Sequence, residues 1–187
     1  MLGGHVVKLE KFSVYFTEPG PENTDDVVKA VAERVENGDI KIVIVASSSG
    51  KTGAKFAEAL KGKAKVIAIA GRKMNREFKG KLVELGGVAF EEGPLVLQKV
   101  DMNDVRNTLY ILGQGFKVAV EVILIAVDKG LIKPYSDVIG VGGSGDGADT
   151  AIVARSTFTK EIFDKDPSKR LEVKEIIAMP LKKKWWY

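Results

Sequence analysis

The chain has 187 residues, a formal net charge of +4 at pH 7 and an apolar fraction of 45%, which fits a globular protein with a sizeable core. It contains no cysteine and a single histidine, His5, to which the pattern assigns no role. Disulfides, thiol nucleophiles, Ser-His-Asp triads and the usual zinc ligand sets are therefore excluded, and no metal site is predicted.

No segment is apolar over the roughly 18 residues that a membrane span requires, because Glu121 interrupts residues 118–127. Residues 1–10 lack the basic start and sustained apolar run of a secretory signal. We therefore expect a cytoplasmic protein with one domain over residues 1–187 and no membrane partner. The sequence leaves open whether the chain forms a homo-oligomer.

Lysine and arginine are spread along the chain and interleaved with acidic residues, so no nucleic-acid partner is predicted. The exception is the basic, aromatic segment 182–187, Lys-Lys-Lys-Trp-Trp-Tyr. It could stack on bases or bind a partner, or it could be an extension that covers apolar surface. The second interpretation is favoured.

The first expected strand covers residues 12–17 and is followed by a loop, residues 18–22, in which two prolines and a glycine prohibit regular structure. Asn23 or Thr24 then caps a helix with an apolar stripe, and Asn37-Gly38 ends it. Residues 40–46 form the second strand.

A Ser- and Gly-rich turn, residues 47–53, separates the β-branched run 42–46 from a helical apolar pattern that starts at Ala54. Residues 65–70 form another strand. Three βα units in succession predict a parallel sheet with right-handed crossovers, whose ligands bind beyond the carboxyl ends of the strands.

The second half of the chain supplies further helices and strands around a glycine-rich bend. The stretch 91–102 has no clear pattern, and the helix over 114–129 is unusually apolar. We predict an α/β fold, a three-layer sandwich with a mainly parallel sheet. The remaining elements are helices over 76–85, 103–112 and 114–129, strands over 88–90, 137–141, 151–154 and 172–179, and the bend over 142–150.

The turn after residue 46 has the composition of a phosphate-binding loop. Backbone N–H groups at a helix N-terminus lack partners, the helix dipole is positive there, and serine and threonine hydroxyls add donors. Glycines let the backbone approach an anion closely. The plainer interpretation is an ordinary N-cap, but three serines and two glycines exceed what one cap needs. The residues concerned are Ser47, Ser48, Ser49, Gly50, Lys51 and Thr52.

Two nucleotide motifs are matched only in part. A triphosphate P-loop would need glycine where Val45 stands, and a strand-buried valine cannot form that opening turn. Residues 140–145 satisfy GxGxxG, but a β-branched segment follows instead of the crossover helix. The bend is better interpreted as joining two strands and aiming backbone N–H groups at a ligand.

Four other polar residues keep two interpretations each. Asp149 and Thr150 could contact a ligand, or Asp149 could simply close its own turn. Lys117 and Glu121 stand four apart on a predicted helix, where they could face a ligand; an ordinary intrahelical ion pair is favoured.

The order of strand, serine-rich turn, helix and strand over residues 42–70, followed by strand, glycine-rich bend and strand over 138–153, resembles the C-terminal α/β domain of pyruvate kinases. More closely, residues 19–24 (PGPENT), 112–121 (LGQGFKVAVE) and 141–151 (VGGSGDGADTA) look like a family of small archaeal proteins with that domain standing alone. Pyruvate kinase catalysis is not implied, because its catalytic barrel is absent.

This resemblance implies an FMN site, because members of the family bind flavin mononucleotide. The phosphate would meet the turn after residue 46, and the bend and the loop before residue 25 would face the rest. The region 71–102 is shorter than the family pattern. The residues implied are Asn23, Thr24, Ser47, Ser48, Ser49, Gly50, Lys51, Thr52, Gly142, Gly143, Ser144, Gly145, Gly147, Asp149 and Thr150.

The expected function is therefore binding of a phosphorylated small molecule, with FMN first. Tyr15, Phe16 or Phe116 could supply a shelf for the flavin ring. Whether the protein is a flavoenzyme or a non-catalytic sensor or carrier is left open. The alternative is a sugar-phosphate isomerase or phosphosugar-sensing regulator, since the turn also resembles the SxSGxT turn of sugar isomerase domains; Glu121 is its one conceivable base.

Overall fold

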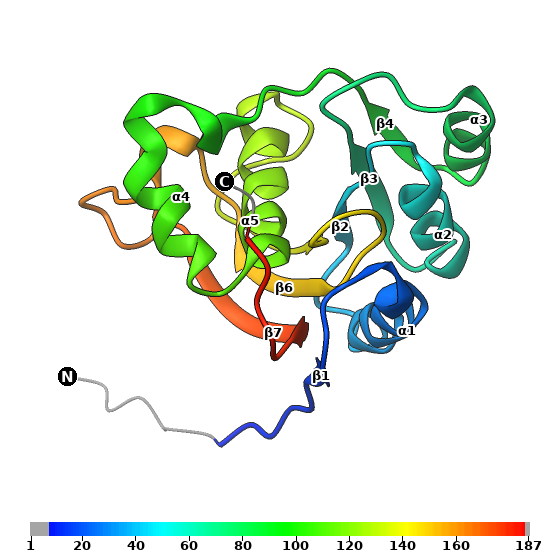
Figure 1. Ribbon diagram of the computed structural model, residues 1–187, viewed down its shortest axis with the longest axis horizontal. Helices are drawn as coiled ribbons and strands as arrows, with labels where there is room; N and C mark the ends of the chain where they lie inside the picture. The colour runs from blue at the N-terminus through cyan, green and yellow to red at the C-terminus, as the bar shows by residue number, and fades with distance from the viewer. Residues whose placement is uncertain (1–7, 186–187) are drawn as a thin grey trace.

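The structure, a computed structural model, describes residues 8–185, so His5 and residues 186–187 of the basic aromatic segment lie outside the described residues. Within residues 8–185, seven strands form one sheet in the order β1-β7-β6-β5-β2-β3-β4, and helices flank it (Figure 1). The predicted α/β sandwich with a mainly parallel sheet is thereby confirmed.

The sheet is parallel except around β6, which pairs antiparallel with both of its neighbours, β5 and β7. The connections between β2, β3 and β4 pass through helices, as parallel pairing requires. The strands are β1 Val14–Phe16, β2 Ile42–Ala46, β3 Lys65–Ile69, β4 Val88–Phe90, β5 Asp137–Gly142, β6 Thr150–Arg155 and β7 Glu172–Pro180.

Most helices begin and end within two residues of the expected positions. The exception is α2, which begins at Lys51 and not at Ala54. The unassigned stretch 91–102 contains two short 3-10 segments. The α-helices are α1 Thr24–Val35, α2 Lys51–Ala59, α3 Arg76–Glu84, α4 Asn103–Tyr110 and α5 Gln114–Asp128; the 3-10 helices are η1 Pro21–Asn23, η2 Val96–Gln98, η3 Val100–Met102 and η4 Thr159–Glu161.

Two apolar cores separate the three layers. On one face of the sheet, α1, α2 and α3 pack their apolar sides on the strands, with Phe56 of α2 and Leu60, which follows that helix, fully buried. On the other face, α5 packs against the sheet and η2, with Ile123 and Leu124 fully buried. The loops that follow the carboxyl ends of the parallel strands lie between the two helical layers.

The described part of the basic aromatic segment lies against the junction of α4 and α5. The indole N–H of Trp185 donates to the carbonyl of Tyr110, and the backbone N–H of Gln114 donates to the carbonyl of Lys184 at 2.8 Å. This arrangement ties the end of the described chain to the start of α5. No helix within residues 8–185 is long and apolar enough to cross a membrane.

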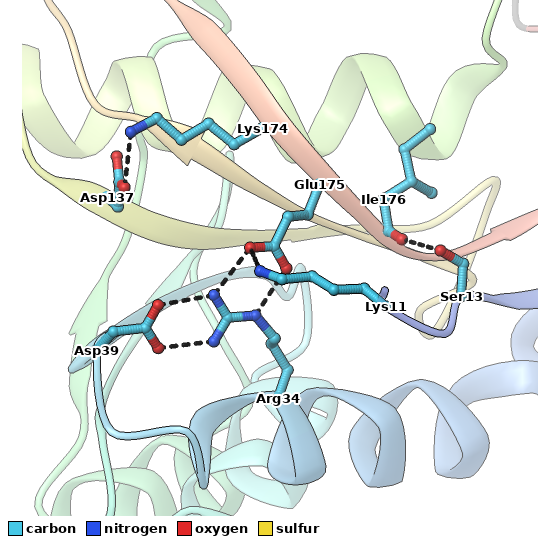
Figure 2. A network of polar contacts seen from close by, with 8 residues as sticks. All are labelled: Lys11, Ser13, Arg34, Asp39, Asp137, Lys174, Glu175 and Ile176. Carbon is cyan, nitrogen blue, oxygen red and sulfur yellow. Dashed lines mark hydrogen bonds and ion pairs between the residues drawn. The ribbon is translucent and has the colours of Figure 1, made fainter. Parts of the chain in front are cut away.

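A buried arginine joins α1 to the sheet (Figure 2). The guanidinium of Arg34 makes two hydrogen bonds to Asp39, at 2.7 and 2.9 Å, and two to Glu175 of β7, at 2.7 and 2.9 Å. Lys11 also pairs with Glu175. The hydrogen bonds from Arg34 lower the pKa of Asp39 to about 2 and lower that of Glu175 below its ordinary value.

We expect this network to make the fold sensitive to acid. Since the folded-state pKa of each carboxyl is depressed, its stabilisation is present above the ordinary pKa and is lost as pH falls through the folded pKa. For Asp39 the window runs from about pH 4 to about pH 2. Urea unfolding across this range should show a falling free energy of unfolding, with a shallower fall in Asp39→Asn. Glu58→Gln removes an exposed pair with Lys81 and should leave the slope nearly unchanged; an equal slope in Asp39→Asn would contradict the assignment.

Candidate functional site

A cavity of ≈ 920 Å³ lies at the carboxyl ends of β2, β3 and β5, between the two helical layers. It is lined by the loop that leads into α1, the turn between β2 and α2, loops after β3 and β4, the bend after β5, and one face of α5. Most of the sequence-predicted residues come from these segments. A cavity of this size is typical of small-molecule sites.

The turn between β2 and α2 is closed by Gly50, which has φ of 88° and forms the N-cap of α2. Its N–H donates to the carbonyl of Ser47 at 3.1 Å. A Cβ at Gly50 would approach the Cβ of Phe78 to 3.1 Å and would strain the left-handed backbone. Gly50 itself is buried and does not line the cavity, so its role is to shape the turn.

Side chains of the turn satisfy some backbone N–H groups and leave others free. Ser47 Oγ accepts from the N–H of Gly53 at 3.0 Å, and Ser49 Oγ accepts from that of Lys51 at 3.4 Å. Among the described residues, the N–H groups of Ser48, Ser49 and Thr52 have no acceptor. Ser48 and Ser49 are exposed and line the cavity. These amides are available to an anion.

Thr52 adds a hydroxyl to the same end of α2. The residue is 7% exposed and lines the cavity, and within residues 8–185 its hydroxyl makes no hydrogen bond. This hydroxyl keeps accessible surface, so it can donate a hydrogen bond to a ligand in the cavity. Thr52 therefore marks this wall of the cavity as polar and unsatisfied.

The N-terminus of α2 differs from those of the helices that follow β1 and β3. Asp25 and Asp26 stand in the first turn of α1, and α3 has Glu77 in its first turn and the side chain of Asn75 as its cap. The first turn of α2 has no acidic residue, and the two hydroxyls that accept from its N–H groups, those of Ser47 and Ser49, are uncharged. No negative charge in this turn therefore offsets the helix dipole.

Two cations without ion-pair partners in the described chain, Lys51 and Arg72, line the cavity on this side. Arg72 follows β3, the strand next to β2, so the two side chains come from adjacent segments of the rim. Four acidic residues among residues 8–185 also line the cavity: Glu22, Asp25 and Asp146 come from the loop before α1, the start of α1 and the bend, and Glu121 of α5 is paired with Lys117. The charge distribution favours an anion next to α2.

The glycine-rich bend after β5 contributes backbone to the cavity. Gly143, Gly145 and Gly147 line it, and the bend also contacts the loop before α1. A Cβ at Gly147 would lie 2.4 Å from Thr24 Oγ1, and the φ of Gly147 is 74°. Glycine is thus required there for close approach of the two loops.

Other predicted residues of the bend do not line the cavity. Asp149 is fully buried, accepts from the N–H of Ser144 at 3.0 Å and from the hydroxyl of Thr150 at 2.8 Å, and so closes the bend. Gly142 packs against α5, where an added Cβ would lie 2.2 Å from the carbonyl oxygen of Gly115. The structure therefore gives Gly142, Ser144, Asp149 and Thr150 places in the packing between the bend and α5.

The predicted residues of the loop before α1 also make hydrogen bonds within the protein. Asn23 donates through its side chain to the carbonyl of Glu18 at 2.9 Å and does not line the cavity. Thr24 lines it, but its hydroxyl donates to Pro21 at 2.6 Å and accepts from the N–H of Ala148 at 3.0 Å. Thr24 therefore fastens the loop to the bend.

The wall formed by α5 carries a buried ion pair. Lys117 Nζ lies 2.9 Å from Glu121 Oε2, and both side chains are 3% exposed. The predicted intrahelical pair is confirmed, and it also lines the cavity. Gln114, one turn earlier, lines the cavity too, and its Oε1 is buried without a hydrogen-bond partner among the described residues. Gln114 was not among the predicted site residues, because its position in the cavity depends on segments distant in the sequence.

None of the aromatic residues proposed as a ring shelf, Tyr15, Phe16 and Phe116, lines the cavity. Phe116 is buried in the core between α5 and the sheet, and Tyr15 lies on the edge strand β1. Apolar lining is supplied instead by aliphatic residues of β3, the loop after β4 and α5: Ile69, Leu95, Val118, Val122 and Ile125. The region 71–102 thus contributes to the cavity.

No protein-family model matches the chain. Within residues 8–185, no group of three or more histidine, cysteine, aspartate or glutamate side chains is placed to hold a metal ion. The case for a function therefore depends on the chemistry of the cavity.

Proposed function

We propose that the cavity binds a phosphorylated small molecule, most specifically FMN, with the phosphate at the N-terminus of α2. The observation that carries the proposal is the set of unsatisfied donors there: three backbone N–H groups and the hydroxyl of Thr52. Lys51 and Arg72 add positive charge beside them. A dianion would satisfy these groups together.

The rest of the cavity suits a flat heterocycle better than a bare sugar. Aliphatic side chains from α5 and from the loop after β4 offer an apolar surface, and the volume is adequate for a flavin. Glycines of the bend expose backbone toward the position of a polyol chain. FMN, when bound, would supply a two-electron acceptor; the proposal concerns binding and assigns no catalytic residue.

A phosphosugar is the second candidate, because Glu121 lies in the cavity as the isomerase hypothesis requires. However, Glu121 Oε2 is paired with Lys117 and its Oε1 accepts from the N–H of Leu97 at 2.9 Å. Both oxygens are therefore occupied, which is a poor arrangement for a general base. Titration with ribose 5-phosphate and fructose 6-phosphate tests this alternative.

The test of the proposal is a comparison of FMN with riboflavin, which has the same ring and polyol but no phosphate. We expect FMN to bind at least about 100-fold more tightly, because the phosphate gains several charge-assisted hydrogen bonds. Flavin fluorescence quenching on titration gives both dissociation constants. Inorganic phosphate should compete with FMN. Equal affinity for FMN and riboflavin would refute a phosphate site at α2.

A further inference from the structure

A polar stripe runs along the cavity face of α5. Gln114, Lys117 and Glu121 are spaced by three and four residues, so they share one face of the helix. The other residues of α5 are mostly apolar and buried. Since burying an ion pair gains little stability over apolar packing, stability alone does not account for this stripe.

Gln114 has an unmet requirement for a hydrogen bond. Its Oε1 is buried, and among the described residues the side-chain amide has no hydrogen-bond partner. A buried amide normally has a partner, because water has been removed from it. Since the residue lines the cavity, rotation of its amide towards the cavity would let a ligand atom that donates a hydrogen bond meet this requirement.

Lys117 supplies a hydrogen-bond donor, its ammonium group, on the same face of α5 as the acceptor of Gln114. Its ammonium donates to Glu121, and it lies 5.8 Å from the centroid of the Tyr110 ring. An ammonium has three donors, so donors remain for a ligand in the cavity. Because Glu121 is itself held by the N–H of Leu97 at 2.9 Å, the position of Lys117 is fixed before a ligand arrives.

Resting on the proposed phosphate-binding function, we propose that Gln114 and Lys117 recognise the end of the ligand that is remote from its phosphate. They select a cis-amide or imide edge, in which an N–H adjoins a carbonyl oxygen. Gln114 accepts from the N–H, and Lys117 donates to the carbonyl. The pyrimidine edge of the flavin ring carries this arrangement, and a sugar phosphate or polyol phosphate does not.

The geometry of the cavity is consistent with a ligand that joins the two subsites. The start of α2 belongs to the helical layer on one face of the sheet, and α5 to the layer on the other. Val118 and Val122 lie on the cavity face of α5 next to the polar stripe, where they can contact a ring. One ligand would thus place its phosphate at α2, its ring on the valines and its imide edge at the polar stripe.

The experiment measures the binding of FMN and of ribitol 5-phosphate, which has the phosphate and polyol but no imide, by isothermal titration calorimetry. The variants are Gln114→Met, which keeps the size of the side chain, and the double variant Lys117→Met with Glu121→Gln, which removes both charges together. Gln98→Met is the matched control, because that glutamine also lines the cavity but its amide oxygen accepts from Arg106 at 3.2 Å. Circular dichroism melts establish which variants fold.

We expect wild type and Gln98→Met to bind FMN at least about 10-fold more tightly than ribitol 5-phosphate. In Gln114→Met this advantage should fall at least about 5-fold, with the affinity for ribitol 5-phosphate unchanged, because the contacts of the ring with the valines remain. An FMN advantage that equals that of wild type in both Gln114→Met and the double variant overturns the inference, as does equal wild-type affinity for the two ligands; both results leave the phosphate site standing. Failure of wild type to bind either ligand refutes the proposed function itself.

Discussion

Replacing Ser49 with aspartate is expected to lower the affinity for FMN at least about 100-fold while the fold stays intact. Ser49 is exposed and lines the cavity beside the N-terminus of α2. The new carboxylate would occupy the position proposed for the phosphate. It would also repel the phosphate group of FMN, which is a dianion. A carboxylate is favourable at the positive end of a helix, so the free energy of unfolding should not fall.

The measurement is FMN titration by fluorescence, combined with urea unfolding of the free protein. Asn107→Asp is a suitable control, because it makes the same change of charge at an exposed position on α4 that does not line the cavity. That variant should bind FMN like the wild type. Wild-type FMN affinity in Ser49→Asp would show that the phosphate does not lie at this turn.

Replacing Gly142 with alanine is expected to lower the free energy of unfolding by about 3 kcal/mol. An added Cβ would lie 2.2 Å from the carbonyl oxygen of Gly115 and 2.6 Å from the amide nitrogen of Ala119. Both atoms belong to the backbone of α5, which cannot move aside as a flexible side chain can. The helix must therefore shift away from β5, and the shift would disturb the buried packing on that face of the sheet.

Gly145→Ala serves as the control for this second change, because a Cβ there would have no heavy atom within 4 Å. Its free energy of unfolding should stay within about 0.5 kcal/mol of wild type. Both values come from urea denaturation with a common slope. If the Gly142→Ala protein were as stable as the Gly145→Ala protein, the backbone of α5 would not lie as close to β5 as the structure has it.

The fold was predictable because its elements carry strong local signals. The run of β-branched residues over 42–46 and the cap expected at Asn23 or Thr24 mark where a strand and a helix begin. The start of α2 was misplaced by three residues, since Lys51, Thr52 and Gly53 have the composition of a turn. What places them in the helix is Gly50, whose left-handed backbone reverses the chain early.

The site was predictable only as far as it is made of consecutive residues. The turn before α2 and the glycines of the bend could be recognised from the order of residues alone. Asp149 looked equally suited to a ligand and to its own turn, and only the contacts with Ser144 and Thr150 distinguish these roles. On α5, Lys117 and Glu121 were recognised as residues that could face a ligand, but Gln114 was not, because its Oε1 becomes buried through packing of distant segments.

The cavity draws its walls from the loop at Pro21 through to the bend at Gly147, so its parts come together only when β5 has paired with β2 across a long intervening sequence. We expect this pairing to form late in folding, because the chain loses the entropy of closing a long loop before the contacts form. A ligand has no assembled site to bind before that event. Its stabilisation should therefore appear as slower unfolding, with the rate of folding left nearly unchanged.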